Sequence, residues 1–422
     1  MLFFGLLIFI FLQIIRPQDF VVGLTDTRLV LYLMVILLFV LLFNPIEKKL
    51  FRSPQDKFAG VFFLSWFFSV IGTFWITQIV DTAIETFKFV LMYYCIVIII
   101  DSEVKLKVAI WTMVILMAIV GLMGILQYHG YNITGAQMSF SQDKGVWQIK
   151  GIGNFDNPND MAYSVVLVTP FALSLLFQYR GFLGRFGGLV LLGISVYCIY
   201  LTRSRGGQVA FAVCLFSWTY FWLRNPKLRR RILILGIVGV LAVAIFQATG
   251  YREDESSMGR IEAWAEGWQL LRSHPLLGVG KGNFGEYHKL DTHNSFVRAG
   301  TELGLFGLYC YVGMLYGVGL TIKRLQEPSV EIRWRTYYAA LGSFFFSYVA
   351  GSAFSTRTYD LVFLLCVALV GALGRVSLKD TAEVSVDGVL FPDETTHVWN
   401  KNIFGLTIAV LIAWYLFLRQ VW

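Results

Sequence analysis

The chain has 422 residues, of which 57% are hydrophobic and only 15% charged, and its formal net charge is +8. A soluble domain needs more polar surface than this, so the composition excludes a soluble protein and indicates an integral membrane protein. The basic excess does not indicate nucleic-acid binding, because the Lys and Arg residues lie between apolar runs, where topology and anionic lipid headgroups account for them.

Apolar runs follow one another along almost the whole chain. Each approaches the length of a transmembrane helix, which predicts an all-α polytopic membrane protein, a bundle of about 12–13 spans of roughly 20 residues each. The first run has no basic leader and no small-residue cleavage site, so we expect a retained helix rather than a signal peptide. The predicted spans are residues 1–15, 28–44, 58–80, 83–100, 107–127, 160–179, 182–201, 207–223, 231–250, 296–322, 336–355, 358–374 and 403–419.

The chain is predicted to form one domain followed by a tether. Residues 1–374 form a single transmembrane bundle, the acidic and polar residues 375–402 form a cytoplasmic linker, and 403–422 hold an accessory C-terminal transmembrane helix. The five cysteines all lie within apolar segments without metal-ligand spacing. We therefore expect neither a metal site nor a cofactor.

The basic residues predict the orientation of the bundle. With a cytoplasmic N-terminus, the inner loops hold clusters such as RNPKLRRR at 224–231, which is the positive-inside pattern. The same count places two long loops, 128–159 and 251–295, on the outer face, together with the short segments 202–206 and 356–357. Loops of such length without transmembrane character are functional or disordered.

Residues 199–211, IYLTRSRGGQVAF, place Arg203 and Arg205 on the outer face, against the positive-inside bias. Arginine pairs with phosphate through two hydrogen bonds and stays charged when partly desolvated. Gly206 and Gly207 would let a ligand approach the start of the next helix, which attracts anions. These features favour a phosphate or pyrophosphate ligand. Alternatively, the arginines reach lipid phosphates or end the span, and in a helix the two could not face one cleft.

The second long outer loop contains a predicted helix. GRIEAWAEGWQLLRSHP at 259–275 places Trp264 and Trp268 on one apolar stripe, with Pro275 just past its end. Such a stripe predicts either a helix on the membrane surface or a helix packed on other outer-loop segments. In both cases Arg260 lies at the N-terminal end of the helix.

The tenth span begins with DTHNSFVRAGTELG at 291–304. Arg298 and Glu302 are four residues apart, which predicts an ion pair on one helix face. Glu302 lies on roughly the opposite side of a straight helix from His293 and is a poor partner for it. A lone histidine is weak evidence of catalysis by itself.

The combination of these motifs resembles the bacterial O-antigen ligase and O-antigen polymerase superfamily. The matching motifs are SRGG after an outward-ending span, GR with a Trp four residues on, GVGKGNF, and HNSFVRAGTELGLFG. The stretch GIGNFDNPNDMA at 151–162 is similar to the Gly- and Asn-containing stretch that often precedes that domain. The resemblance covers about residues 150–320; elsewhere the chain matches only in being a bundle of spans.

The resemblance implies a metal-independent glycosyltransferase with a membrane-type, GT-C-like architecture. Members transfer a glycan from an undecaprenyl-pyrophosphate carrier to an acceptor sugar or lipid core at the periplasmic or outer face of the bacterial inner membrane. By motif, Arg205 and Arg260 would hold the donor pyrophosphate, with Arg203 beside them, and His293 would serve the acceptor hydroxyl. The supporting residues are Gly206, Gly207 and Asn294.

The residue types suit this chemistry on their own. A lipid pyrophosphate is already a good leaving group, so the enzyme needs positive charge where negative charge develops, and arginines supply it. A histidine with an unperturbed pKa of about 6.5 can take the proton of the attacking hydroxyl near neutral pH. The mechanism proposed for the family implies inversion at the sugar carbon in a single displacement.

Other functions remain open at this point. A polymerase that extends a repeat-unit polysaccharide and a ligase that moves it onto a lipid core share every motif above. A transporter or flippase for a lipid-linked or anionic substrate is the alternative from another class. It should carry ionisable residues or broken helices near the bilayer midplane, whereas the charges of this chain concentrate at one face.

Overall fold

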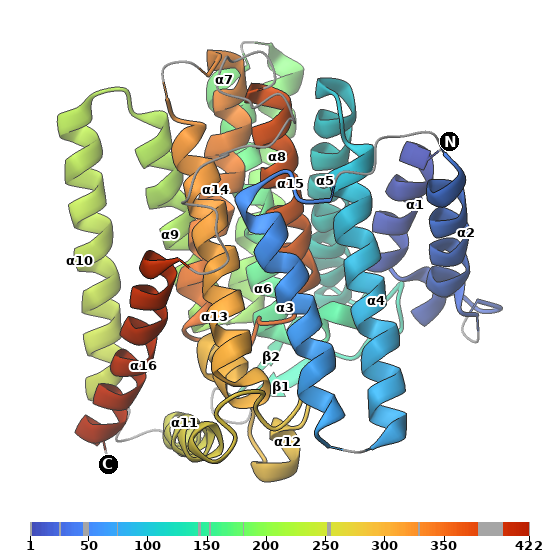
Figure 1. Ribbon diagram of the computed structural model, residues 1–422. Helices are drawn as coiled ribbons and strands as arrows, with labels where there is room; N and C mark the ends of the chain where they lie inside the picture. The colour runs from blue at the N-terminus through green and yellow to red at the C-terminus, as the bar shows by residue number, and fades with distance from the viewer. Residues whose placement is uncertain are drawn as a thin grey trace.

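The computed structural model describes residues 2–24, 27–44, 50–73, 75–141, 145–151, 153–179, 181–250, 255–327, 330–378 and 400–421. Its helices stand side by side in one bundle (Figure 1). Each predicted span coincides wholly or largely with a helix or a pair of helices. These are α1 (Leu2–Ile14), α2 (Leu29–Phe43), α3 (Pro54–Ile71), α4 (Ile76–Ile99), α5 (Glu103–Tyr128), α6 (Pro158–Val165) with α7 (Val168–Gln178), α8 (Phe182–Thr202), α9 (Arg205–Trp222), α10 (Pro226–Gly250), α13 (Ser295–Arg324), α14 (Arg335–Ser352), α15 (Leu361–Leu378) and α16 (Lys401–Val421).

Eight segments in the described part of the chain are long and apolar enough to cross a membrane. The chain is an all-α polytopic membrane protein, as predicted. This number is lower than the predicted 12–13 because α2 is shorter and helices such as α3, α9 and α14 are less apolar. α3 packs on α13, and α14 packs on α9. This packing buries polar side chains such as Gln55 and Ser65 of α3 and Ser343 of α14 against protein.

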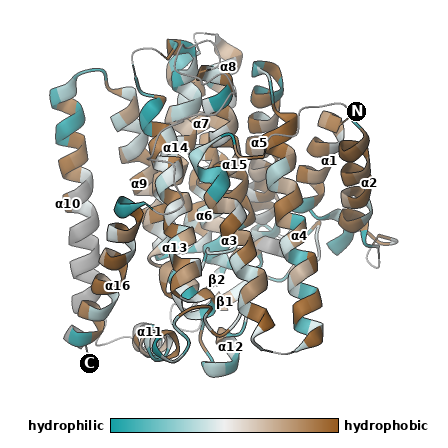
Figure 2. Cartoon of the chain, in the orientation of Figure 1, coloured by the Kyte–Doolittle hydropathy of each residue, from teal (hydrophilic) through white to brown (hydrophobic). Residues whose placement is uncertain are grey.

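The outward surface of the bundle is strongly apolar. Hydrophobic residues cover the outer faces of α1 and α2 in Figure 2. Phe39 and Phe43 of α2, for example, are largely exposed. Such a surface is unfavourable in water and suits contact with lipid chains.

The third span differs from its predicted position. α3 begins at Pro54 because Ser53 and Asp56 form a capping box in front of it. It ends at Ile71, and residues 76–80, predicted as its last turn, belong to α4.

A buried ion pair holds α3 to α15, near the first turn of α3 and the last turn of α15. Arg375 lies 3.7 Å from the carboxylate of Asp56. Tyr93 of α4 donates a hydrogen bond to the same carboxylate at 2.9 Å, and Tyr94 donates to the Asp56 carbonyl at 2.9 Å. Three helices are thus joined through one carboxylate.

The two long predicted loops lie together at one end of the bundle, which we call the loop end (Figure 1). The first contains the antiparallel strands β1 (Ser139–Ser141) and β2 (Val146–Gln148), and the second contains α11 (Glu255–Ser273) and α12 (Phe284–Tyr287). Residues 142–144, 152 and 251–254 of these loops lie outside the described residues. So does most of the predicted linker, residues 379–399.

α13 is interrupted at Gly304, where the sequence predicted a continuous span. Gly304 has φ +68° and ψ −169°, and its neighbours lose their helical hydrogen bonds there. The loop that follows α11 replaces those bonds: Val279 N–H donates to the Thr301 carbonyl at 3.0 Å, and Leu305 N–H donates to the Pro275 carbonyl at 2.8 Å. The loop after α11 therefore packs against α13 at this break.

Candidate active site

Arg203 and Arg205 lie in the turn that joins α8 to α9. Arg203 ends α8 in the left-handed conformation, φ 52°, and its guanidinium lies 4.0 Å from the centre of the Tyr200 ring. Ser204 caps α9 by accepting a hydrogen bond from Gly207 N–H at 3.0 Å. Arg203 thus ends α8, whereas Arg205 begins α9. The expectation that the two side chains point in different directions holds only within one helix, so it does not apply to them. Arg205 is exposed and Arg203 is half-buried.

The start of α6 and strand β2 hold this turn in place. The Ser204 hydroxyl donates to Asn159 Oδ1 at 2.6 Å, and Gln148 Nε2 donates to the Thr202 carbonyl at 2.9 Å. The Asn-containing stretch 151–162 therefore supports the SRGG motif directly.

Gly206 and Gly207 allow α9 to pack closely on α6. A Cβ atom at Gly206 would clash with the hydroxyl of Tyr163, and one at Gly207 would clash with the methyl group of Ala162. We expected these glycines to leave room for a ligand. The structure fills that room with α6 instead, so the glycines serve helix packing.

Arg260 lies near the N-terminal end of α11, as predicted. The tryptophan stripe of α11 packs on protein: Trp264 Nε1 donates to the Thr292 carbonyl at 2.6 Å, and the Trp268 ring lies 5.2 Å from that of Trp414 in α16. The sequence predicted either a helix on the membrane surface or a helix packed on other outer-loop segments. The structure shows a packed helix, and one of its partners is the transmembrane helix α16. The predicted accessory helix α16 is thereby tied to the helix that carries Arg260.

His293 lies in the loop before α13 and has a left-handed backbone conformation, φ 47°. Such a φ is uncommon outside glycine and needs support from its surroundings. Asn294 supplies it: its Oδ1 accepts from Phe296 N–H at 2.9 Å as the N-cap of α13, and its Nδ2 donates to the Ala353 carbonyl at 3.2 Å. Asn294 therefore fixes the loop from which His293 projects.

The charges around His293 favour its neutral form. Burial and the positive charge of Arg260 lower the pKa of His293 from its usual value, with Asp291 opposing the shift. Within the described part of the chain, no residue hydrogen-bonds the His293 ring. A neutral imidazole with an unoccupied nitrogen can accept a proton from a substrate.

Arg260 and His293 are thus brought together, and Tyr163 connects them to the SRGG turn. Tyr163 lies against Gly206 at the start of α9, and the charge of Arg260 acts on its phenol group. The guanidinium of Arg260 would favour a negatively charged ligand at this position.

Arg357, between α14 and α15, is a residue that the sequence did not single out. It is 3% exposed and forms ion pairs with Asp160 at 2.8 Å and with Asp360 at 3.0 Å. Its backbone N–H donates to Ser295 Oγ at 2.7 Å. Arg357 therefore joins the start of α6 to the start of α13. A signal was present, because an arginine in a very short outer loop opposes the positive-inside bias.

Comparison with known proteins agrees with this geometry. Residues 189–312 match the model of the O-antigen ligase family, a segment that runs from α8 through Arg205, Arg260 and His293 into α13. Residues 189–312, less than a third of the chain, thus match an O-antigen ligase domain. The resemblance to the O-antigen ligase and polymerase superfamily is thereby confirmed. The segments that hold Tyr163 and Arg357 lie outside the matched range.

A curated relative supports the same family. The chain is 28% identical to the exopolysaccharide production protein ExoQ of Rhizobium meliloti strain 1021, over 37% of this chain and 43% of the relative. The match thus spans less than half the length of that relative.

Within the O-antigen ligase domain, the ion pair predicted between Arg298 and Glu302 is confirmed, with 2.6 Å from Nε to Oε1. Arg298 also pairs with Asp291, and Tyr359 donates to Glu302 Oε2 at 2.8 Å. Glu302 is fully buried in this network. Its side-chain partners come from α13 itself and from Tyr359, which lies outside the matched range.

The GVGKGNF motif of the domain places a buried lysine beside α4. Lys281 Nζ lies 2.5 Å from Glu85 Oε2. It also lies 5.0 Å from the centre of the Trp66 ring and 4.8 Å from that of Tyr359. Lys281 therefore links the loop after α11 to α4 and α3.

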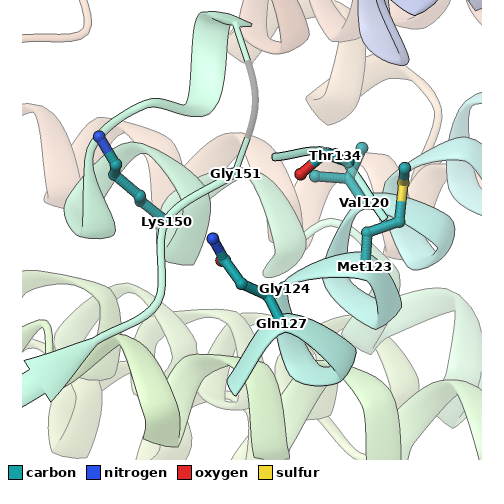
Figure 3. A pocket seen from close by; sticks show the side chains of 7 residues that line it. All are labelled: Val120, Met123, Gly124, Gln127, Thr134, Lys150 and Gly151. Carbon is teal, nitrogen blue, oxygen red and sulfur yellow. The ribbon is translucent and has the colours of Figure 1, made fainter. Parts of the chain in front are cut away.

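The described residues offer no metal site. No group of three or more His, Cys, Asp or Glu among them could hold a metal ion. A pocket beside the first long loop has a volume of about 10 Å³, which is room for one water molecule. Figure 3 shows its lining residues, Val120, Met123, Gly124, Gln127, Thr134, Lys150 and Gly151.

Proposed function

We propose that the chain is a metal-independent glycosyltransferase that acts in surface polysaccharide biosynthesis, of the O-antigen ligase or polymerase type. It transfers a glycan from an undecaprenyl-pyrophosphate-linked donor to an acceptor sugar on the periplasmic or outer face of the bacterial inner membrane. The observation that carries the proposal is that the charge of Arg260 acts on His293 and also on Tyr163, which lies beside the turn of Arg205.

The donor side of the reaction requires positive charge. In this proposal Arg205 and Arg260 bind the pyrophosphate oxygens, and Arg203 supports them from the end of α8. Negative charge grows on the pyrophosphate as its bond to the sugar breaks, and guanidinium groups fixed beside it stabilise that charge. The action of the Arg260 charge on both His293 and Tyr163 supports its assignment.

The acceptor side requires a base. The acceptor hydroxyl oxygen attacks the anomeric carbon of the donor glycan, and the bond from that carbon to the pyrophosphate oxygen breaks with its electron pair. His293 takes the hydroxyl proton. Its lowered pKa supports this role, because it keeps the imidazole neutral at neutral pH. One displacement of this kind inverts the anomeric carbon.

The polymerase type is favoured over the ligase type by one observation. The name of the relative refers to exopolysaccharide production. A polymerase uses a second lipid-linked glycan as its acceptor, whereas a ligase uses a lipid core. The two therefore differ in product rather than in the residues described above.

The transporter alternative has less support. The buried charged residues among those described are Asp56, Lys281, Glu302 and Arg357. Each lies in a loop or within about two turns of a helix end. One helix is broken, at Gly304, but a protein loop fills that break. A transporter instead uses charges and broken helices around a midplane cavity.

The proposal is tested with the purified chain in lipid nanodiscs and an undecaprenyl-pyrophosphate-linked oligosaccharide. Wild-type protein should yield longer carrier-linked glycans, or glycan on an added lipid core if it is a ligase. Arg260→Gln and His293→Ala should each lower the transfer rate by at least 100-fold. Arg272→Ala is the matched control, because Arg272 is exposed at the far end of the same helix. Movement of intact donor across the membrane without a new glycosidic bond would instead support the transporter.

A further inference from the structure

The hydroxyl group of Tyr163 is buried and has no hydrogen-bond partner among the described residues. The whole side chain is 3% exposed. A buried hydroxyl without a partner is unfavourable, and native structures contain few of them. This one therefore requires an explanation.

The hydroxyl lies at the first turn of α9. It occupies the space that a side chain at Gly206 would need, directly after Arg205. The N-terminus of a helix attracts anions through its backbone N–H groups and its dipole, and α9 is 18 residues long. The unpaired hydroxyl thus lies beside a helix terminus that favours a negatively charged ligand.

Two arginines act on the Tyr163 phenol. The guanidinium of Arg357 lies 5.4 Å from the ring centre, but Asp160 and Asp360 balance its charge. The charge of Arg260 also acts on the phenol. Positive charge beside a hydroxyl favours an acceptor with negative charge as its hydrogen-bond partner.

We propose that Tyr163 is a further donor-binding residue, whose hydroxyl donates a hydrogen bond to a phosphate oxygen of the lipid-linked pyrophosphate at the start of α9. This inference rests on the proposed function, because it takes the pyrophosphate donor as the ligand. It adds a neutral hydrogen-bond donor to the arginines. It also assigns a role to a residue outside the matched O-antigen ligase segment.

The packing of Tyr163 does not depend on the hydroxyl. The ring packs against Gly351 of α14, a contact that phenylalanine preserves; toward Gly206 of α9, phenylalanine keeps Cζ and loses only the hydroxyl. A structural hydroxyl stabilises the fold, whereas an unpaired one does not. Tyr163→Phe therefore separates the two roles.

The test compares Tyr163→Phe with wild-type protein in detergent, using farnesyl pyrophosphate as the lipid pyrophosphate probe. The variant should unfold at the same temperature as wild type or higher, and its Kd for the probe should rise about 10- to 100-fold, as for a lost hydrogen bond to a charged group. Tyr94→Phe is the matched control. Its hydroxyl donates to the Asp56 carbonyl at 2.9 Å, far from the loop end, so this variant should lose stability and keep its affinity.

The outcomes separate the inference from the proposed function. Equal affinity of wild type and Tyr163→Phe, or a lower unfolding temperature of Tyr163→Phe, overturns the role of the hydroxyl alone. Failure of wild type to bind farnesyl pyrophosphate overturns the proposed donor and the inference with it. Equally tight binding of inorganic pyrophosphate identifies a free anion as the ligand and overturns the lipid-linked assignment.

Discussion

Ser204 and Asn159 join the SRGG turn to the start of α6 through one hydrogen bond of 2.6 Å, from Oγ to Oδ1. The same Ser204 oxygen accepts from Gly207 N–H and so caps α9. One hydroxyl thus fixes both the beginning of α9 and its position against α6. Arg205, the first residue of α9, depends on both contacts.

We therefore expect Ser204→Ala to weaken the protein in two ways. Loss of the cap should lower the free energy of unfolding by about 1 kcal/mol. Loss of the contact with Asn159 should weaken donor binding by releasing Arg205. Thermal unfolding and the KM for the lipid-linked donor measure the two effects. Ser204→Thr keeps a hydroxyl and should behave like wild type; a normal KM in Ser204→Ala would contradict the positioning role.

The pH dependence of transfer should report the charge of Arg260. Burial and this charge lower the pKa of His293, so the acid limb of the rate profile should lie below the ordinary histidine pKa of about 6.5. Arg260→Gln removes a positive charge that disfavours protonated His293. The pKa should rise, and the residual activity should decline at a higher pH than in wild type. An unmoved acid limb would mean that another group titrates.

Gly206→Ala should disrupt the contact between α9 and α6. The new methyl group clashes with the Tyr163 hydroxyl, and overpacking of this kind costs about 1–3 kcal/mol. In the Tyr163→Phe background the nearest remaining atom is Cζ, at 3.1 Å, so the same substitution should cost less. A double-mutant cycle of unfolding free energies measures the coupling. Additive effects would show that the hydroxyl does not face Gly206.

Truncating Trp414 of the last helix, α16, should impair transfer even though Trp414 lies outside the candidate active site. Trp414 packs on Trp268 and donates a hydrogen bond to the Trp264 carbonyl at 3.2 Å. Trp414→Ala should loosen α11 and with it Arg260, so the KM for the donor should rise several-fold. Ile412→Ala, which alters an exposed residue on the same helix, is the control. If both variants retain wild-type KM, α16 is accessory to catalysis, as the sequence predicted.

The buried ion pair of Asp56 and Arg375 should matter for stability rather than for transfer. Arg375→Ala leaves the Asp56 carboxylate buried without its cation, a change that costs about 3–5 kcal/mol. The unfolding temperature should fall sharply. At temperatures where the variant is folded, its transfer rate should match that of wild type, because the pair lies far from the loop end.

Local patterns in the sequence predict local features of the structure well. Apolar runs of helix length predicted the spans, and the spacing of Arg298 and Glu302 predicted their ion pair. Arg260 was placed correctly because the helical stripe after it is complete within one segment. Such features depend on residues a few positions apart, which a single sequence displays.

Features that depend on distant residues could not be predicted in this way. Arg357 meets Asp160, which lies on another helix 197 positions away. The break at Gly304 exists because the loop after α11 supplies its hydrogen bonds, and the glycines of SRGG are required by Tyr163 and Ala162. In each case the deciding partner comes from tertiary packing, to which a single sequence gives no direct access.

The break at Gly304 makes α13 two mechanical units. The loop after α11 is hydrogen-bonded to both units, to the Thr301 carbonyl on one side of the break and to Leu305 N–H on the other. A rod that spans a membrane tilts when the thickness of the bilayer changes. Because the helical hydrogen bonds are interrupted at Gly304, we expect such tilting to bend α13 there. The loop that bridges the break should then limit how much of this movement reaches His293.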